Sequence, residues 1–207
     1  DFQVYALQFE IALSDDLSII AVKDGFIDFN PDDTLSSESG MADLGAGIKY
    51  VFYRDEKTAA SARLVYEAPI GDDEVWQGNG DGTLNPGVSV MTHAGNVQLG
   101  SSIGYIQALD NDEESSMFYD SWQASVALNE TVTPLIELNH FHVTDTGAGV
   151  NQFTAHAGGA VPAIARFEGG DLVNLGAVNS SDNRDLVTLA VGARFQLTEQ
   201  LDLGAAF

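Results

Sequence analysis

Apolar and polar side chains alternate with a period of two along most of the chain, the pattern of β-strands that have two different faces. Between residues 42 and 53, one face carries Leu44, Ile48 and Tyr50, and the other carries Asp43 and Lys49. Ten segments show this alternation: 3–14, 17–23, 41–53, 58–70, 83–92, 97–108, 117–128, 132–142, 186–197 and 201–207. No segment of comparable length follows the helical period, so the sequence predicts an all-β fold.

The connections between these segments are alternately short and long. Short turns lie at 15–16, 54–57, 93–96, 129–131 and 198–200, and long connections lie at about 24–40, 71–82, 109–116 and 143–185. Bacterial outer-membrane barrels have short periplasmic turns and long outer loops. With both barrel ends in the periplasm and an even strand number, this predicts about twelve strands, about ten of them in this segment. We therefore expect one domain over 1–207, an antiparallel up-and-down transmembrane β-barrel truncated at both ends.

Composition excludes several other classes of protein. The chain carries 31 acidic and 8 basic residues, for a net charge of -23, which excludes the basic surface of a nucleic-acid-binding protein. It has no cysteine, and therefore no disulfide framework, thiol chemistry or Cys-based zinc site. The sequence contains no run of about 18 apolar residues, so it does not predict a transmembrane helix. Nothing in the sequence predicts a cofactor.

The composition of the polar face indicates which face meets water. A soluble ligand-binding β-barrel shows the same alternation turned inside out, and its water-exposed exterior should be about a quarter to a third charged. Three neighbouring segments instead carry small or neutral polar residues, among them Asn85, Ser89, Gln98, Ser102 and Ser121. Such residues suit a narrow lumen. Aromatic residues near strand ends, such as Tyr50 and Trp122, fit interfacial girdles, although ordinary packing is the alternative.

Charged and amide side chains on the polar face are the candidate lumen lining. They are Glu10, Asp43, Lys49, Arg63, Glu67, Glu137, Asn139 and Arg194. Charges of both signs in a pore would shape its field and selectivity. The alternative is structural, in which ion pairs fill a narrow lumen.

Most of the acidic residues lie in the long connections. Outer-membrane lipid and divalent cations are therefore candidate partners of these connections, and a solvated, repulsive surface is the alternative. The run Gly78–Thr83 resembles one copy of a calcium-binding Gly/Asp repeat, which is weak evidence alone. His140 and His142 share one face near a strand end. They suit an outer rim. The alternatives are a metal site, for which the sequence supplies no third ligand, and a lipid hydrolase with a nearby serine, for which Thr144 is a poor substitute.

The connection 143–185 is far longer than an ordinary loop. Its apolar middle needs burial, and Pro162 can open a short helix that Gly169 ends. We expect the middle to fold inward and constrict or cover the lumen, with Pro162, Arg166 and Phe167 at the constriction. An external flap is the alternative.

Three runs resemble a known family: 43–50 (DLGAGIKY), 63–71 (RLVYEAPIG) and 134–139 (PLIELN). They are similar to outer-membrane barrels of the meta-pathway phenol-degradation or transporter group. The resemblance implies a bacterial outer-membrane location and passive passage of small solutes, aromatic or hydrophobic molecules among them, and it supplies no catalytic residues. The alternatives are a narrow structural barrel without conductance, a barrel-embedded lipid hydrolase and a soluble ligand-binding barrel.

Overall fold

The computed structural model describes residues 2–30, 37–75, 77–78, 80–110, 114–145, 185–198 and 201–206. These residues form eleven strands: β1 (Phe2–Ala12), β2 (Leu17–Phe29), β3 (Glu38–Met41), β4 (Leu44–Arg54), β5 (Thr58–Ala68), β6 (Thr83–Ala94), β7 (Val97–Ala108), β8 (Ser116–Val126), β9 (Val132–Asp145), β10 (Asp185–Thr198) and β11 (Leu201–Ala206). A single 3₁₀ turn among them, η1, covers Asp73–Val75. No helix in these ranges is long and apolar enough to cross a membrane.

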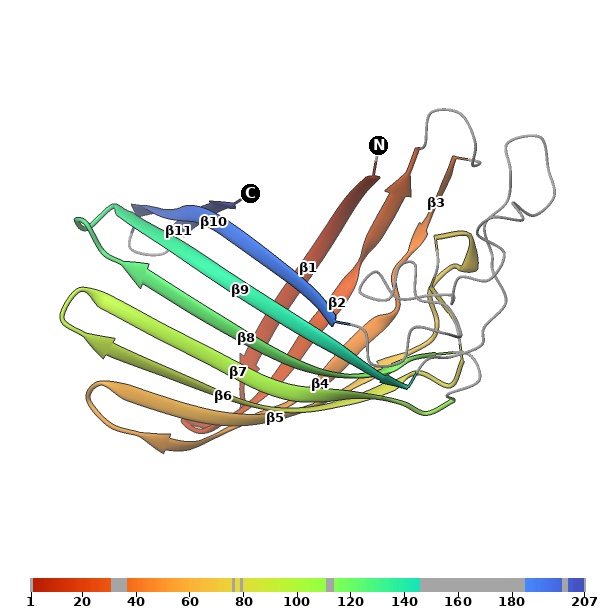
Figure 1. The fold of residues 1–207 in the computed structure, drawn as a ribbon, viewed down its shortest axis with the longest axis horizontal. Coiled ribbons are helices and arrows are strands. Elements are labelled where there is room, and N and C mark those ends of the chain that lie inside the picture. Colours follow the sequence, from red (N-terminus) through yellow and green to blue (C-terminus); the bar gives the residue numbers. More distant parts are fainter. Residues whose placement is uncertain are drawn as a thin grey trace.

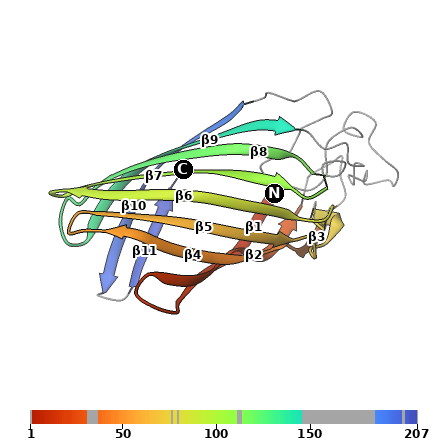
Figure 2. The ribbon, with the colours of Figure 1, turned by 90° about the horizontal axis from the view of Figure 1, so that it is seen from below.

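All the strands belong to one antiparallel sheet in which neighbours in sequence are neighbours in space. The order is β1-β2-β4-β5-β6-β7-β8-β9-β10-β11, and β3 pairs with the C-terminal end of β2, from Phe26 to Phe29. The sheet is strongly curved, so that β1 and β10 lie on opposite sides of a trough (Figures 1 and 2). No pairing joins β1 to β11 within the described ranges, and the sheet is open there. The predicted all-β, antiparallel, up-and-down topology is confirmed.

Each of the ten predicted segments corresponds to a strand, but the prediction was wrong between residues 24 and 43. Strand β2 continues to Phe29 instead of ending at Lys23, and the additional strand β3 pairs with this extension. The register between β2 and β4 shifts between Ala21 and Lys23. A bulge of this kind inserts one residue and interrupts the alternation, so the sequence pattern ends where the strand does not.

Single polar side chains close several of the short turns. Asp55 Oδ1 accepts hydrogen bonds from the backbone N–H groups of Lys57 (2.8 Å) and Thr58 (2.7 Å). The hydroxyl of Tyr53, and then these two backbone groups, hold the pKa of Asp55 below its ordinary value. Asn129 Oδ1 accepts from two backbone N–H groups in the β8–β9 turn in the same way. Such Asx turns fix the hairpins and, through them, the register of the sheet.

The two faces of the sheet differ sharply. Large apolar side chains on the convex face stay about half exposed: Leu44 45%, Ile48 51%, Leu64 46%, Leu99 47%, Ile103 48% and Val191 53%. The fully buried apolar side chains gather instead toward the end of the sheet that carries η1, and they include Ile27, Val65 and Met117. The sheet therefore has a small core at one end and leaves its convex apolar face uncovered.

Candidate functional site

The concave face of the sheet encloses a pocket of about 750 Å³. Two rows of directly paired residues cross the concave face from strand to strand. One row runs Lys49–Arg63–Gly87–Gly104–Tyr119, from β4 to β8. The neighbouring row runs Ser61–Ser89–Ser102–Ser121–Asn139, from β5 to β9. The pocket therefore has a hydroxyl-lined floor beside a row that begins with two cations.

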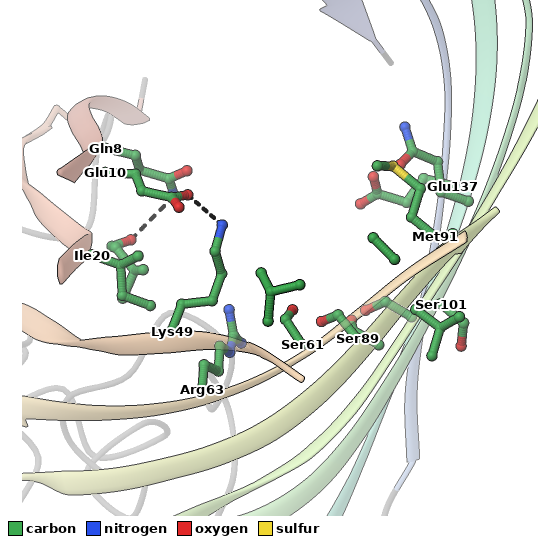
Figure 3. A pocket seen from close by; sticks show the side chains of 18 of the residues that line it. Gln8, Glu10, Ile20, Lys49, Ser61, Arg63, Ser89, Met91, Ser101 and Glu137 are labelled. Atoms are coloured by element: carbon green, nitrogen blue, oxygen red, sulfur yellow. Dashed lines mark hydrogen bonds and ion pairs between the residues drawn. The ribbon is translucent and has the colours of Figure 1, made fainter. Parts of the chain in front are cut away.

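Lys49 and Glu10 form an ion pair inside the pocket (Figure 3). Glu10 lies on β1 and Lys49 on β4, so the pair reaches across β2, which separates the two strands in the sheet. The side chains are 30% exposed for Lys49 and 44% exposed for Glu10, so the pair faces the open pocket rather than a sealed core. This contact compensates the charge of Lys49 and ties the β1 edge to the middle of the sheet.

Arg63 is held by Tyr119, three strands away. An Arg63 guanidinium N–H donates to the Tyr119 hydroxyl (2.9 Å), and that hydroxyl donates to Asn85 Oδ1 (3.0 Å). The guanidinium carbon also lies 5.7 Å from the centre of the tyrosine ring, within cation–π distance. Tyr119 is only 5% exposed, and its ring packs on β6 and β7 at Gly87 and Gly104.

Gly87 and Gly104 provide the space for this ring. A Cβ at Gly104 would lie 2.2 Å from the Tyr119 hydroxyl oxygen and 2.6 Å from the Pro86 carbonyl oxygen, and a Cβ at Gly87 would lie 2.6 Å from the same hydroxyl. Real Cβ atoms do not approach other atoms this closely. The two glycines therefore form a notch that fits Tyr119 and, through it, fixes Arg63.

Glu137 and Asn139 line the pocket from β9: Asn139 ends the row that begins with Ser61, and Glu137 lies two residues before it on the same face. Asn139 Nδ2 donates to Glu137 Oε1 (2.9 Å). Figure 3 shows Glu137 across the pocket from Lys49 and Arg63, with Ser61 and Ser89 between them. The pocket thus has a cationic wall and an anionic wall, and a field acts across it.

The remaining predicted lumen residues do not line this pocket. Glu67 shares the concave face, and its cross-strand partners are Gly45 and Thr83. Arg194 borders a second, smaller pocket of about 210 Å³ with Gln98, Ser125 and Gln196. Asp43 lies in the connection between β3 and β4. The predicted constriction residues Pro162, Arg166 and Phe167 lie outside the described residues.

The acceptor role of Asp43 is a feature that the sequence did not indicate. Its Oδ1 accepts hydrogen bonds from the backbone N–H groups of Gly71 (2.8 Å) and Gly78 (2.9 Å), and its own N–H donates to Gln77 Oε1 (3.1 Å). Asp43 is 3% exposed, and Gln77 is fully buried. Asp43 thus anchors the β5–β6 connection, residues 69–82. We predicted residues 71–82 of it only as a long outer loop.

This connection packs on the concave side at the η1 end of the sheet. The Asp72 carboxylate accepts from the Met41 N–H (2.6 Å), and the Asp72 N–H donates back to the Met41 carbonyl (3.0 Å). Val75 in η1 is 1% exposed, and η1 packs against β3 and β2, where Ile27 is also 1% exposed. Gly78, the first residue of the run that resembles a calcium-binding repeat, has a positive φ of 73°, as residues in tight turns do. The connection therefore narrows this end of the trough.

His140 and His142 form a chain of polar contacts on the convex face. His140 Nδ1 lies 2.9 Å from Asp120 Oδ2, and His140 Nε2 lies 2.8 Å from Asp185 Oδ1. His142 Nδ1 lies 2.8 Å from that same Asp185 oxygen, and Trp122 Nε1 donates to Asp120 (2.8 Å). No group of three or more His, Cys, Asp or Glu side chains in the described ranges is arranged to hold a metal ion. These polar contacts make one patch of the convex face polar, near the end where β10 begins.

The Thr144 hydroxyl, considered above as a stand-in for a serine nucleophile, is engaged locally. It lies 2.8 Å from the Tyr105 hydroxyl and donates to the Ser116 carbonyl (3.0 Å). These contacts link β7, β8 and β9 at the same end of the sheet.

The comparison with protein families finds a match. The family model described as "Putative MetA-pathway of phenol degradation" matches residues 10–179, more than half of the chain. The matched region runs from the pocket residue Glu10 in β1 through β9. The comparison with curated proteins gave no match.

Replacing Gly104 with alanine should disturb the notch. The added methyl would overlap the Tyr119 ring and the Pro86 carbonyl, so we expect a loss of about 1–3 kcal/mol in the free energy of unfolding. Gly100→Ala is the matched control on the same strand and face, since its Cβ would meet only the Gln123 side chain at 3.6 Å or beyond. Denaturant titration of the folded protein measures both. Equal losses for the two variants would contradict the notch.

Replacing Asp43 with alanine should release the β5–β6 connection. The N–H groups of Gly71 and Gly78 each lose one hydrogen bond to a carboxylate, so local opening at each should become easier by about 1.5–3 kcal/mol. Amide hydrogen exchange at Gly71 and Gly78 should then be about tenfold to a hundredfold faster. Asp43→Asn keeps an acceptor oxygen and should show a smaller effect. Asp16→Ala, in an exposed turn, is the control and should leave exchange at both glycines unchanged.

Proposed function

The chain belongs to the family described as "Putative MetA-pathway of phenol degradation", and from this membership and its two-faced sheet we propose that it is an outer-membrane pore for the passive passage of small solutes. The observation that carries the proposal is the contrast between the faces. Apolar side chains stand on the convex face, and a charged, hydroxyl-lined pocket lies on the concave face. A soluble barrel would have the opposite arrangement.

The exposed convex face favours a membrane environment. Its large, half-exposed apolar side chains follow the alternation over β4, β5, β7 and β10, and an apolar face that spans several strands is rarely left exposed by soluble monomers. Lipid hydrocarbon covers such a face without any cost for exposed apolar area. A membrane-spanning sheet must also be closed, because an open edge in hydrocarbon leaves backbone groups unsatisfied. Closure into a barrel of about twelve strands is therefore part of the proposal.

The polar contacts on the convex face suggest where the hydrocarbon ends. His140, His142, Asp120 and Asp185 lie toward the end of the sheet that carries the long connections, and Trp122, near the middle of β8, donates to Asp120. Charged groups are costly in hydrocarbon, and tryptophan prefers the interface. We place these polar side chains at the level of the lipid headgroups on the outer side of the membrane, with the short turns in the periplasm.

The lining of the pocket favours small polar or aromatic molecules as the solutes that pass through. Its lining combines hydroxyl, amide and charged groups with apolar residues such as Ile20 and Met91. The family description names phenol degradation, and we propose that solutes of the size of a single aromatic ring pass through this lumen. The β5–β6 connection narrows one end of the trough and limits solute size there.

Conductance of the full-length protein in a planar lipid bilayer tests the proposal. A pore should give stepwise, ohmic current increments, and Asp43→Ala should enlarge them by loosening the β5–β6 connection. A protein that is folded in the bilayer but gives no current would instead support a narrow structural barrel. A protein that folds and stays monomeric in buffer without detergent would support a soluble ligand-binding barrel.

The facing of the strands gives a sharper test with two neighbouring residues of β7. Ile103 stands on the convex face and Ser102 in the pocket. Ile103→Arg should cost about 2–4 kcal/mol of folding free energy in lipid vesicles, as an arginine does near the bilayer midplane. Ser102→Arg should cost much less, because the arginine would point into the lumen. Similar costs for both variants would contradict the proposed orientation.

A further inference from the structure

Arg63 is the pocket cation whose position the structure fixes most fully. Its donor bond to Tyr119, the bond from Tyr119 to Asn85, and the two glycines beneath the ring hold the guanidinium against the wall. A guanidinium carries five N–H donors. Tyr119 is its single hydrogen-bond acceptor within the described ranges, so most of these donors remain for a ligand in the pocket.

The charge around Arg63 is locally unbalanced. Lys49 stands directly opposite it in the β4–β5 register, and like charges in this position destabilise a sheet. Glu10 compensates Lys49. No carboxylate in the described part of the chain forms an ion pair with Arg63. One positive charge on this wall therefore lacks a counter-charge, and a bound anion would remove the repulsion.

Neutral donors lie in the adjacent row. Ser61 lies two residues before Arg63 on the same face of β5, and Ser89 and Ser102 continue its row in register. All three serines and Arg63 line the pocket. Each hydroxyl can donate one hydrogen bond to an acceptor seated on the guanidinium. The opposite wall carries Glu137, which repels an anion and favours its position at Arg63.

We propose that Arg63 and the adjacent serines form a binding subsite for the carboxylate group of a small solute. The planar guanidinium matches a carboxylate with two parallel N–H···O bonds, a fit that a lysine ammonium does not provide. Tyr119 acts as a positioning residue, since it orients the guanidinium without contacting the solute. This inference rests on the proposed pore function, because it names the class of solute that the same lumen holds.

Equilibrium binding of benzoate to the full-length protein in detergent, measured by calorimetry, tests the subsite. Benzamide, which has nearly the same shape without the charge, is the matched probe. Arg63→Gln should weaken benzoate binding about tenfold or more, the scale of one hydrogen bond between charged groups, and should leave benzamide binding unchanged. Arg63→Lys keeps the charge and should bind with intermediate affinity. Arg194→Gln, at the second pocket, is the control and should bind benzoate as the unmodified protein does.

Tyr119→Phe tests the positioning role. It removes the hydroxyl that holds Arg63 while keeping the ring in the notch, so it should weaken benzoate binding less than Arg63→Gln and leave the far-ultraviolet circular dichroism unchanged. If Arg63→Gln does not fold, Arg63→Lys and Tyr119→Phe carry the comparison.

The outcomes separate this subsite from the pore itself. No benzoate binding by the folded protein, equal affinity in Arg63→Gln, or an equal loss in Arg194→Gln would overturn the subsite. Binding is measured at equilibrium and does not depend on current through a bilayer. A folded protein that binds benzoate through Arg63 but gives no conductance would overturn the pore and keep the subsite.

Discussion

The pairing register of the sheet is the constraint on which the rest of the structure depends. Because successive side chains alternate between faces, a slip of one residue would move every pocket side chain of the slipped strand to the convex face. The register places Lys49 opposite Arg63 and Gly87 opposite Gly104, which brings Tyr119 over the glycines and against the guanidinium. The side chains that close the short turns hold this register from one end.

Alternation predicted the strands well because it reports which residues of one strand share a face. It failed where a bulge interrupts it, at Ala21–Lys23, and so missed both the end of β2 and the whole of β3. It also extended β4 backward through Asp43, since the residue has the expected polarity for the concave face. A carboxylate that accepts backbone hydrogen bonds from a connection about 30 residues away has no signature in local periodicity.

The candidate site shows the same limit. Alternation assigned Lys49, Arg63 and Glu137 to one face, and the structure has them on one face. It could not pair Glu10 with Lys49 across β2, or Arg63 with Tyr119 across two strands, because such contacts depend on register and curvature together. Gly87 and Gly104 read in sequence as small lumen residues. Their role as a notch appears only when Tyr119 is in place.

The distribution of charge explains why a few residues can govern the pocket. The chain carries a net charge of -23, yet the pocket lining has two acids, Glu10 and Glu137, and two bases, Lys49 and Arg63. Most of the other acids lie in connections, where water and salt screen them over about 10 Å. The walls of the pocket screen far less, so its field depends on these four side chains rather than on the overall charge. Because Glu10 and Lys49 compensate each other, Arg63 and Glu137 set the direction of that field. The notch that fixes Arg63 therefore fixes the position of one of the two charges that produce it.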